Sequence, residues 1–207
     1  MEALAAQGDI SGPTRIGEVI EASTTEFVAQ CYVLHEAPPF GSLVRASDGE
    51  VDVFGVVANA RTGSVDPGRR PVARGRDEED EEDIYRSNPE LREILRTEFT
   101  TVVVGSRDIG GSYQQWLPRR PPRLHAFVYA CSREEAAGFT ERLDFLPTLL
   151  GGAGRAPADE LVAACLREAS AARGNDREFL VRAGKELAVL LAGDLNRLSA
   201  ILRRIRR

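Results

Sequence analysis

The stretch VDVFGVV at residues 51–57 decides the fold. Its odd-numbered positions hold valine or glycine and alternate with the residues between them, so it predicts a β-strand with one strongly apolar face. Gly55, inside this strand, indicates a bend or the close approach of another backbone. The sequence SDG at 47–49 is a turn signal, and it marks where the strand begins.

Further short β segments lie on both sides of this strand. The sequence predicts strands at 16–20, 27–34 and 42–46 before it, and another at 99–104 after it. The last of these carries apolar residues on both faces, as central strands do. Short strands separated by turn signals, at intervals of about 8–12 residues, predict a small barrel or a sandwich.

Residues 61–83 interrupt this pattern. They contain several glycines and prolines and end in seven consecutive acids at 77–83. We expect a solvated loop, because like charges in a row repel one another and resist burial. An electrostatic docking segment is an alternative. A metal site is another, although the run lacks the alternating ligands and central glycine of an EF-hand loop. A short helix at 88–95 is predicted to follow, with Pro89 near its first turn.

The second half of the chain is mostly helical. Its proline-rich stretch at 107–123 predicts a semi-rigid linker, and a strand at 124–130 follows. Ser132 and Glu135 have the spacing of a capping box, in which each side chain accepts from the other residue's backbone N–H. Further helices are predicted from Pro157 to Gly174 and from Asp176 to the C-terminus. The apolar residues of the last helix share one face, which is either an intramolecular core or a seam between copies. They are Leu180, Gly184, Leu187, Leu191, Leu195, Leu198, Leu202 and Ile205.

The sequence therefore predicts an α+β protein, with a small N-terminal barrel or sandwich followed by a mostly α-helical C-terminal domain. The family resemblance given below selects a small N-terminal β-barrel. A flexible tail at 1–13 precedes the barrel at 14–106. The linker at 107–123 joins it to residues 124–207, which form a strand and the helical domain.

Composition excludes several classes of protein. Lys185 is the single lysine, and Glu186 follows it, so the chain has no Walker-A phosphate loop. No apolar run is long enough to span a bilayer, and the N-terminus lacks the basic start and apolar core of a signal peptide. We expect a cytoplasmic protein with no membrane partner.

The cysteines and histidines offer little chemistry. Three widely spaced cysteines predict buried reduced thiols, and two distant histidines do not form a zinc-ligand pattern. Cys31 and His35 are four residues apart in a predicted strand, so a thiol nucleophile and an imidazole base on one face are conceivable. No glycine-framed nucleophile motif surrounds Cys31. We therefore assign no catalytic residue, cofactor or metal, and expect a buried thiol beside a surface imidazole.

Two groups of residues are candidate contacts for a partner or for nucleic acid. The first combines arginines with aromatic rings, as single-strand nucleic-acid binding sites do; its alternative role is to clamp the two domains together. It comprises Tyr113, Trp116, Arg119, Arg120 and Arg123. The second closes the last helix, where cations complement the helix dipole or contact a phosphate or a partner. It comprises Arg203, Arg204, Arg206 and Arg207.

Three stretches of the barrel region resemble a HAS barrel, the small β-barrel shared by HerA-type DNA translocases and the catalytic subunits of rotary ATP synthases. They are RIGEVIEASTTEFVAQ at 15–30, PFGSLVRA at 39–46 and VFGVV at 53–57, and the resemblance covers residues 14–106. In HerA-type proteins the barrel precedes a RecA-like motor with a Walker-A loop. Here a linker and a mostly helical region follow it instead.

The resemblance implies a barrel used for assembly or docking without ATP hydrolysis. In HerA-type relatives the barrel helps subunits form rings and meets partners such as the NurA nuclease, and it contributes no catalytic residue that could be carried over.

We therefore expect a non-enzymatic assembly or adaptor module. It would oligomerise through the barrel or dock onto a larger complex, such as a HerA-like or nucleic-acid-processing one. Residues 1–110 carry 21 acidic and 11 basic residues, and residues 111–207 carry 11 and 16. These opposite net charges favour contact with a protein partner or head-to-tail contact between copies. The alternative is a nucleic-acid-binding module that uses the two arginine groups.

Overall fold

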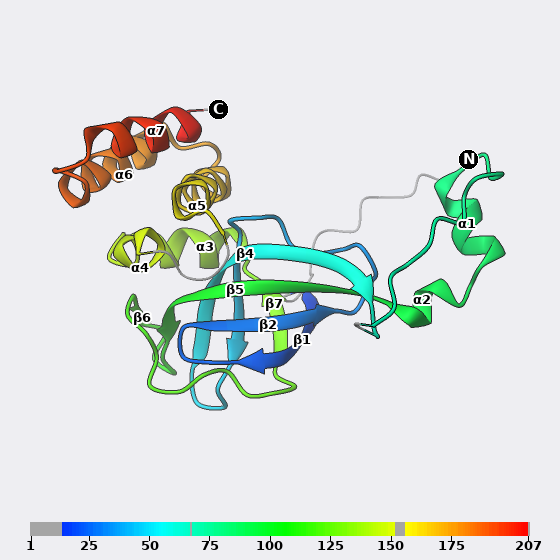
Figure 1. Ribbon diagram of the computed structural model, residues 1–207. Coiled ribbons are helices and arrows are strands. Elements are labelled where there is room, and N and C mark those ends of the chain that lie inside the picture. The colour runs from blue at the N-terminus through cyan, green and yellow to red at the C-terminus, as the bar shows by residue number, and fades with distance from the viewer. Residues whose placement is uncertain (1–13, 67, 152–155, 207) are drawn as a thin grey trace, which may run out of the picture.

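Six antiparallel strands close into a barrel in the computed structural model, which describes residues 14–66, 68–151 and 156–206 (Figure 1). The described sheet has seven strands in all, β1 (Arg15–Ala22), β2 (Glu26–Cys31), β3 (Leu43–Ser47), β4 (Asp52–Ser64), β5 (Leu95–Arg107), β6 (Tyr113–Gln114) and β7 (Phe127–Ala130), and all but β6 form the barrel. The order around the barrel is β2, β1, β7, β3, β4 and β5. The barrel closes because β5 also pairs with β2, where Thr101 stands opposite Phe27. The short β6 extends the sheet beside the end of β5.

The helices fall into two sets. They are α1 (Glu81–Ser87), α2 (Leu91–Ile94), α3 (Arg133–Phe139), α4 (Leu146–Leu150), α5 (Ala158–Ala172), α6 (Arg177–Leu190) and α7 (Leu195–Ile205). Helices α3 to α7 lie together over one side of the barrel, whereas α1 and α2 stand away from it at the far end of the β4–β5 hairpin (Figure 1). The predicted α+β class, with an N-terminal barrel and C-terminal helices, is confirmed.

The barrel includes a strand that the sequence analysis grouped with the helices. β7 pairs with β1, where Val128 stands opposite Gly17, and with β3, where Tyr129 stands opposite Arg45. That grouping was wrong, because the partners of β7 lie near the start of the chain and no local pattern reveals them. The stretch 107–123 also packs on the barrel, since it contains β6 and the buried Gln115.

Each face of β4 and β5 contributes to a different hydrophobic core. Val53 and Val57 point into the barrel, whereas Phe54 and Val56 point outward against the helices. A strand alternates its side chains, so two covered faces require apolar residues at nearly every position. This explains the apolar run in β5, where the sequence predicted a central strand. Gly55 lies at an irregularity in the β4–β5 register, and a Cβ there would lie 2.5 Å from Thr101.

The interior core fills the barrel. It consists of Val19, Phe27, Ala29, Cys31, Val44, Ala46, Val53, Val57, Phe99, Val103 and Val128. The second core, here called the junction core, lies between the barrel wall and helices α3 to α7. At its centre Phe139 of α3 stacks on Phe54 of β4 with ring centroids 5.0 Å apart. The junction core is continuous, and it holds the barrel and the helices together.

The acidic run is partly helical, contrary to the solvated loop expected for 61–83. β4 continues to Ser64, and α1 begins at Glu81 with Asp80 as its N-cap, whose carboxylate accepts from the N–H of Glu82. Acids in the first turn of a helix complement its dipole, so this part of the run favours a helix start. The other exception is β2, which ends at Cys31 although the sequence predicted a strand to residue 34.

The predicted last helix is two helices. α6 ends at Leu190, and α7 begins at Leu195 with Asp194 as its N-cap, accepting from the N–H of Arg197. The break changes which face is buried, so Leu195 is 69% exposed although the repeat placed it with the buried leucines. The capping box of Ser132 and Glu135 at the start of α3 is confirmed.

Two expectations concern residues outside the described ranges: the tail at 1–13 and Arg207. Among the described helices, none has the length and hydropathy required to cross a membrane.

Candidate interaction surface

Several turns meet at the end of the barrel where β3 and β5 finish. The β3–β4 turn is stiff, because the carboxylate of Asp48 accepts 2.8 Å hydrogen bonds from the N–H groups of Glu50 and Val51. Gly49 has φ of +99°, and the guanidinium of Arg123 lies where its side chain would be. The Arg123 backbone N–H donates to the Ser47 carbonyl at 3.1 Å. These contacts fix the stretch after β6 against the turn.

Two hollows flank this turn. One, of about 320 Å³, is lined by Trp116, Leu117, Arg119 and Arg120 together with the turn itself. The other, of about 450 Å³, is lined by Ile109 and by residues at the start of β4 and the end of β5. We call this end the barrel-end surface. It comprises Glu50, Ile109, Trp116, Leu117, Arg119 and Arg120.

The barrel-end surface exposes large apolar side chains beside charges. Trp116 is 60% exposed and Ile109 is 91% exposed. Arg120 donates to Glu50 at 3.0 Å, whereas Arg119 makes no ion pair within the described residues. Exposed aromatic and arginine side chains around a hollow are typical of protein interfaces.

A partly buried network of four charges lies next to this surface and joins the barrel to α3. Arg45 lies 2.9 Å from Glu135 and 3.5 Å from Asp52, and Arg107 lies 3.0 Å from Glu135 and 2.6 Å from Asp52. Desolvation alone would lower the pKa of Arg107. Its hydrogen bonds to Asp52 and Tyr113, with the charges of Asp52 and Glu135, raise it overall, so the guanidinium stays charged.

The family comparison identifies the barrel itself. The model of the HAS barrel domain matches residues 16–115, which span β1 to β6. The chain contains a HAS barrel domain. β7, the sixth strand of this HAS barrel, lies beyond the matched residues. Among curated proteins, none matches the chain.

The HAS barrel brings together only part of the first predicted group. Trp116, Arg119 and Arg120 line one hollow, and Arg123 lies on the adjoining turn. Tyr113 lines the other hollow, and its ring packs against the junction core, where it meets Phe54 and Phe139 edge-on.

The second predicted group lies elsewhere. Arg203 and Arg204 are on α7, above the HAS barrel in Figure 1, and Arg204 is bonded to Glu160 of α5. Arg206 is the exposed C-cap of α7. The two arginine groups therefore do not form one surface.

The candidate thiol–imidazole pair is not assembled. Cys31 lies in the interior core, and burial together with the charge of Glu36 raises its pKa to about 11. The His35 ring turns instead toward α1, where its Nε2 lies 2.6 Å from the Tyr85 hydroxyl. In the described ranges, no cluster of three His, Cys, Asp or Glu side chains could hold a metal ion.

Sequence reasoning missed Ile109 and the four-charge network. The Asp-Ile-Gly-Gly sequence at 108–111 places an apolar residue in a turn, which is a signal for an exposed contact residue. The network has no such signal, because its members come from β3, β4, β5 and α3 and meet only in the folded barrel.

Proposed function

We propose that this protein is a docking module whose barrel-end surface binds another protein. The observation that carries the proposal is the exposure of Trp116, Leu117 and Ile109 around one stiff turn of a HAS barrel. Burying such side chains on binding is favourable, at about 25 cal/mol per Å² of apolar surface. The HAS barrel resemblance implies the same role, assembly or docking.

The charged residues at the edge of the barrel-end surface determine how the partner is oriented. Arg119 has no carboxylate partner within the described residues, whereas Arg120 is already paired with Glu50. We expect the partner to offer a carboxylate to Arg119 at the edge of an apolar contact. Rim charges of this kind set the association rate and orientation more than the affinity.

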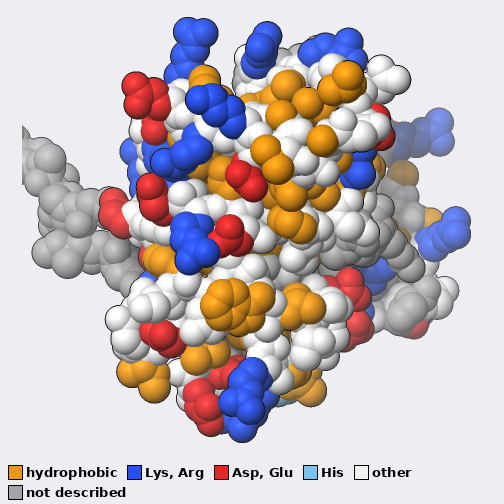
Figure 2. All heavy atoms as spheres, turned by 90° about the vertical axis from the view of Figure 1, so that its left-hand side faces the viewer, with side chains coloured by type: hydrophobic (Ala, Val, Ile, Leu, Met, Phe, Trp, Pro, Cys, Tyr) orange, Lys and Arg blue, Asp and Glu red, His pale blue; other side chains and the backbone are white. Residues whose placement is uncertain are grey.

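In this proposal the helices are a rigid support for the barrel. The junction core and the four-charge network tie α3 to the wall of the barrel. On the face that carries the helices and β6, hydrophobic side chains gather over the upper part, where the helices lie (Figure 2). The exposed large hydrophobic residues of α6 and α7 include Val181, Val189, Leu190 and Leu195.

The test is capture of a partner by the purified protein, with Trp116→Ala/Leu117→Ala compared against Leu195→Ala. All three positions are exposed, so both variants should remain folded. We expect a protein identified by mass spectrometry in the wild-type capture to be lost with Trp116→Ala/Leu117→Ala and kept with Leu195→Ala. Equal capture by both variants would refute docking at this surface.

A second candidate function, binding of single-stranded nucleic acid, rests on Trp116 beside Arg119, which has no ion-pair partner in the part of the chain that the structure describes. Trp116 is the only tryptophan, so its fluorescence reports directly on this hollow. Base stacking would quench the fluorescence on titration with an oligonucleotide, and added salt would reverse the quenching. Charge reversal of Arg119, Arg120 and Arg123 that leaves the affinity unchanged would exclude this function.

A further inference from the structure

The segment between β4 and β5 projects from the barrel at the end opposite the barrel-end surface (Figure 1). We call residues 65–94 the arm; Pro67 within it is not described. The arm has little core of its own. α1 buries none of its residues, and α2 buries only Leu91. Ordering such a segment costs backbone entropy at every residue, and burial of apolar surface normally offsets that cost.

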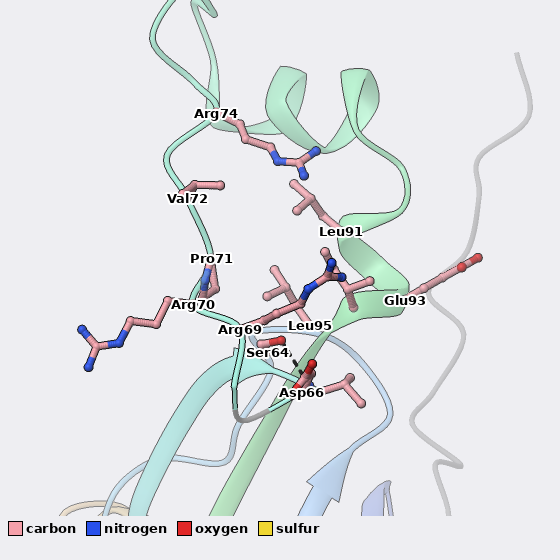
Figure 3. A pocket seen from close by; sticks show the side chains of 12 residues that line it. Ser64, Asp66, Arg69, Arg70, Pro71, Val72, Arg74, Leu91, Glu93 and Leu95 are labelled. Atoms are coloured by element: carbon pink, nitrogen blue, oxygen red, sulfur yellow. Dashed lines mark hydrogen bonds between the residues drawn. The ribbon is translucent and has the colours of Figure 1, made fainter.

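A groove of about 500 Å³ runs between the two sides of the arm (Figure 3). Its apolar lining is largely open to solvent, since Val72 is 75% exposed, Val65 45% and Ile94 41%. The side chain of Arg69 reaches across the groove toward Leu91, whereas Arg70 points away from it. Exposed apolar side chains gathered in one groove are typical of a surface that another chain covers.

The charges of the arm are separated into two blocks. The basic block contains Arg69, Arg70, Arg74 and Arg76, and the acidic block is the run of seven acids at 77–83. The blocks do not pair with each other among the described residues. Arg74 is bonded to Asn88 and Glu90, and Asp83 is bonded to Arg86. Apart from Arg74 and Asp83, the members of each block form no ion pair within the described residues, so they can meet an opposite charge on another molecule.

We propose that the arm is a self-docking surface, through which two copies of this chain pair about a two-fold axis. An isologous contact requires a surface that is complementary to itself. With two arms antiparallel, the Arg69–Arg76 block of each chain faces the acidic block of the other, and the apolar grooves are covered in the same contact. A wholly acidic partner would be repelled by the acidic block, and a wholly basic partner would be repelled by the arginines. A second copy offers an opposite charge to each of the two blocks.

This pairing goes beyond the docking proposed for the barrel-end surface and does not depend on it. The two surfaces lie at opposite ends of the barrel (Figure 1), so one chain can use both at once.

The test measures the mass of the full chain in solution by sedimentation velocity over a range of protein and salt concentrations. Two charge-reversed variants are compared, Arg69→Glu/Arg70→Glu and Glu78→Arg/Glu79→Arg, with Arg203→Glu on α7 as a control. We expect a wild-type dimer that weakens with salt. Each arm variant should raise the dissociation constant by about tenfold or more, and the control should leave it unchanged.

Mixing the two arm variants is the decisive measurement. Each variant alone opposes like charges at its substituted positions in both contacts of the dimer. The heterodimer has opposite charges at these positions in both contacts, so it should form where neither variant dimerises. A monomeric wild-type chain at all concentrations would overturn the proposal. A dimer insensitive to both reversals would do so as well. A dimer lost in Trp116→Ala/Leu117→Ala but kept in the arm variants would place self-association at the barrel end instead. Circular dichroism of each variant confirms that it is folded.

Discussion

The two halves of β4 differ in burial although they belong to one continuous strand. From Val53 to Ala58 every residue is buried, because one face fills the barrel and the other packs under the helices. From Asn59 to Thr62 every residue is exposed, and the strand continues with β5 as a ribbon that carries the arm. The same hairpin is therefore core at one end and a projecting support at the other.

The regions beyond these halves differ in the same way. The junction is held by a continuous core and four interlocked charges, whereas the arm is held by local hydrogen bonds such as the one from the Val65 N–H to the Ile94 carbonyl. We expect substitutions at the junction to affect the whole molecule and substitutions in the arm to act locally.

The largest effect is expected from Phe139→Ala. This ring is fully buried between Phe54 and Phe145, so its removal leaves a cavity in the junction core. We expect the free energy of unfolding to fall by about 3–5 kcal/mol in urea denaturation. Val72→Ala in the arm is the matched control and should change it by less than about 0.5 kcal/mol. Similar losses from both variants would mean that the arm belongs to the cooperative core.

A smaller effect is expected from Glu135→Gln. Glutamine at this helix position retains the capping interaction with Ser132 but removes the charge between Arg45 and Arg107. The side chain is mostly buried, so we expect a loss of about 1–3 kcal/mol. Glu134→Gln, at the exposed neighbouring position, should be nearly neutral in the same denaturation measurement. If the two substitutions cost the same, the network does not hold the junction.

Alkaline pH should weaken both cores together. Burial raises the pKa of Cys31, in the interior core, to about 11, and that of Cys165, in the junction core, to about 12. Unfolding lets these thiols ionise near their ordinary pKa. Their burial in the protonated form therefore contributes fully to the free energy of unfolding below about pH 9. This contribution is lost above that pH, by about 1 kcal/mol per thiol between pH 9 and pH 10.

Cys31→Ala/Cys165→Ala should flatten this decline, whatever its effect at neutral pH. Alkylation by iodoacetamide, followed by mass spectrometry, adds a second readout, because both thiols should become reactive at the same urea concentration. Labelling of Cys165 well before Cys31 would show that the helices unfold independently of the barrel.

The smallest effect is expected from Tyr85→Phe. This substitution removes the hydrogen bond between Tyr85 and His35 that links α1 to the barrel. We expect global stability to change by less than about 1 kcal/mol, because both groups are solvent-accessible. Amide hydrogen exchange should rise in α1 and stay unchanged in α5. Unchanged exchange in α1 would mean that other contacts hold the arm.

The short strands and their turn signals predicted a small barrel or a sandwich, and the resemblance to a HAS barrel selected the barrel. The apolar run in β5 predicted a strand covered on both faces, and the structure supplies the barrel interior and the helices. For residues 51–57 the sequence predicted one strongly apolar face, whereas both faces of β4 are covered there. The capping box at Ser132 was predictable because it depends on residues three positions apart.

The features that could not be predicted depend on residues distant in sequence, or on a local capping residue that ends a helix within a continuing apolar repeat. The pairing of β7 needs strands from the start of the chain. The split between α6 and α7 depends on Asp194, which caps α7 where the apolar repeat alone continues. Of the candidate surface, Trp116 and Arg119 were identified from the clustering of arginines with aromatic residues. Tyr113, from the same cluster, packs instead against the junction core, beside Phe54 and Phe139, which are distant in sequence.

The position of β7 late in the chain also determines when the barrel can close during synthesis. Until residues 127–130 leave the ribosome, β1 and β3 each present an open edge, because the strand that belongs between them does not yet exist. The nascent barrel is an unclosed sheet during that interval, and open edges are where chains aggregate. A fragment ending at residue 115, the limit of the family match, would keep that gap permanently.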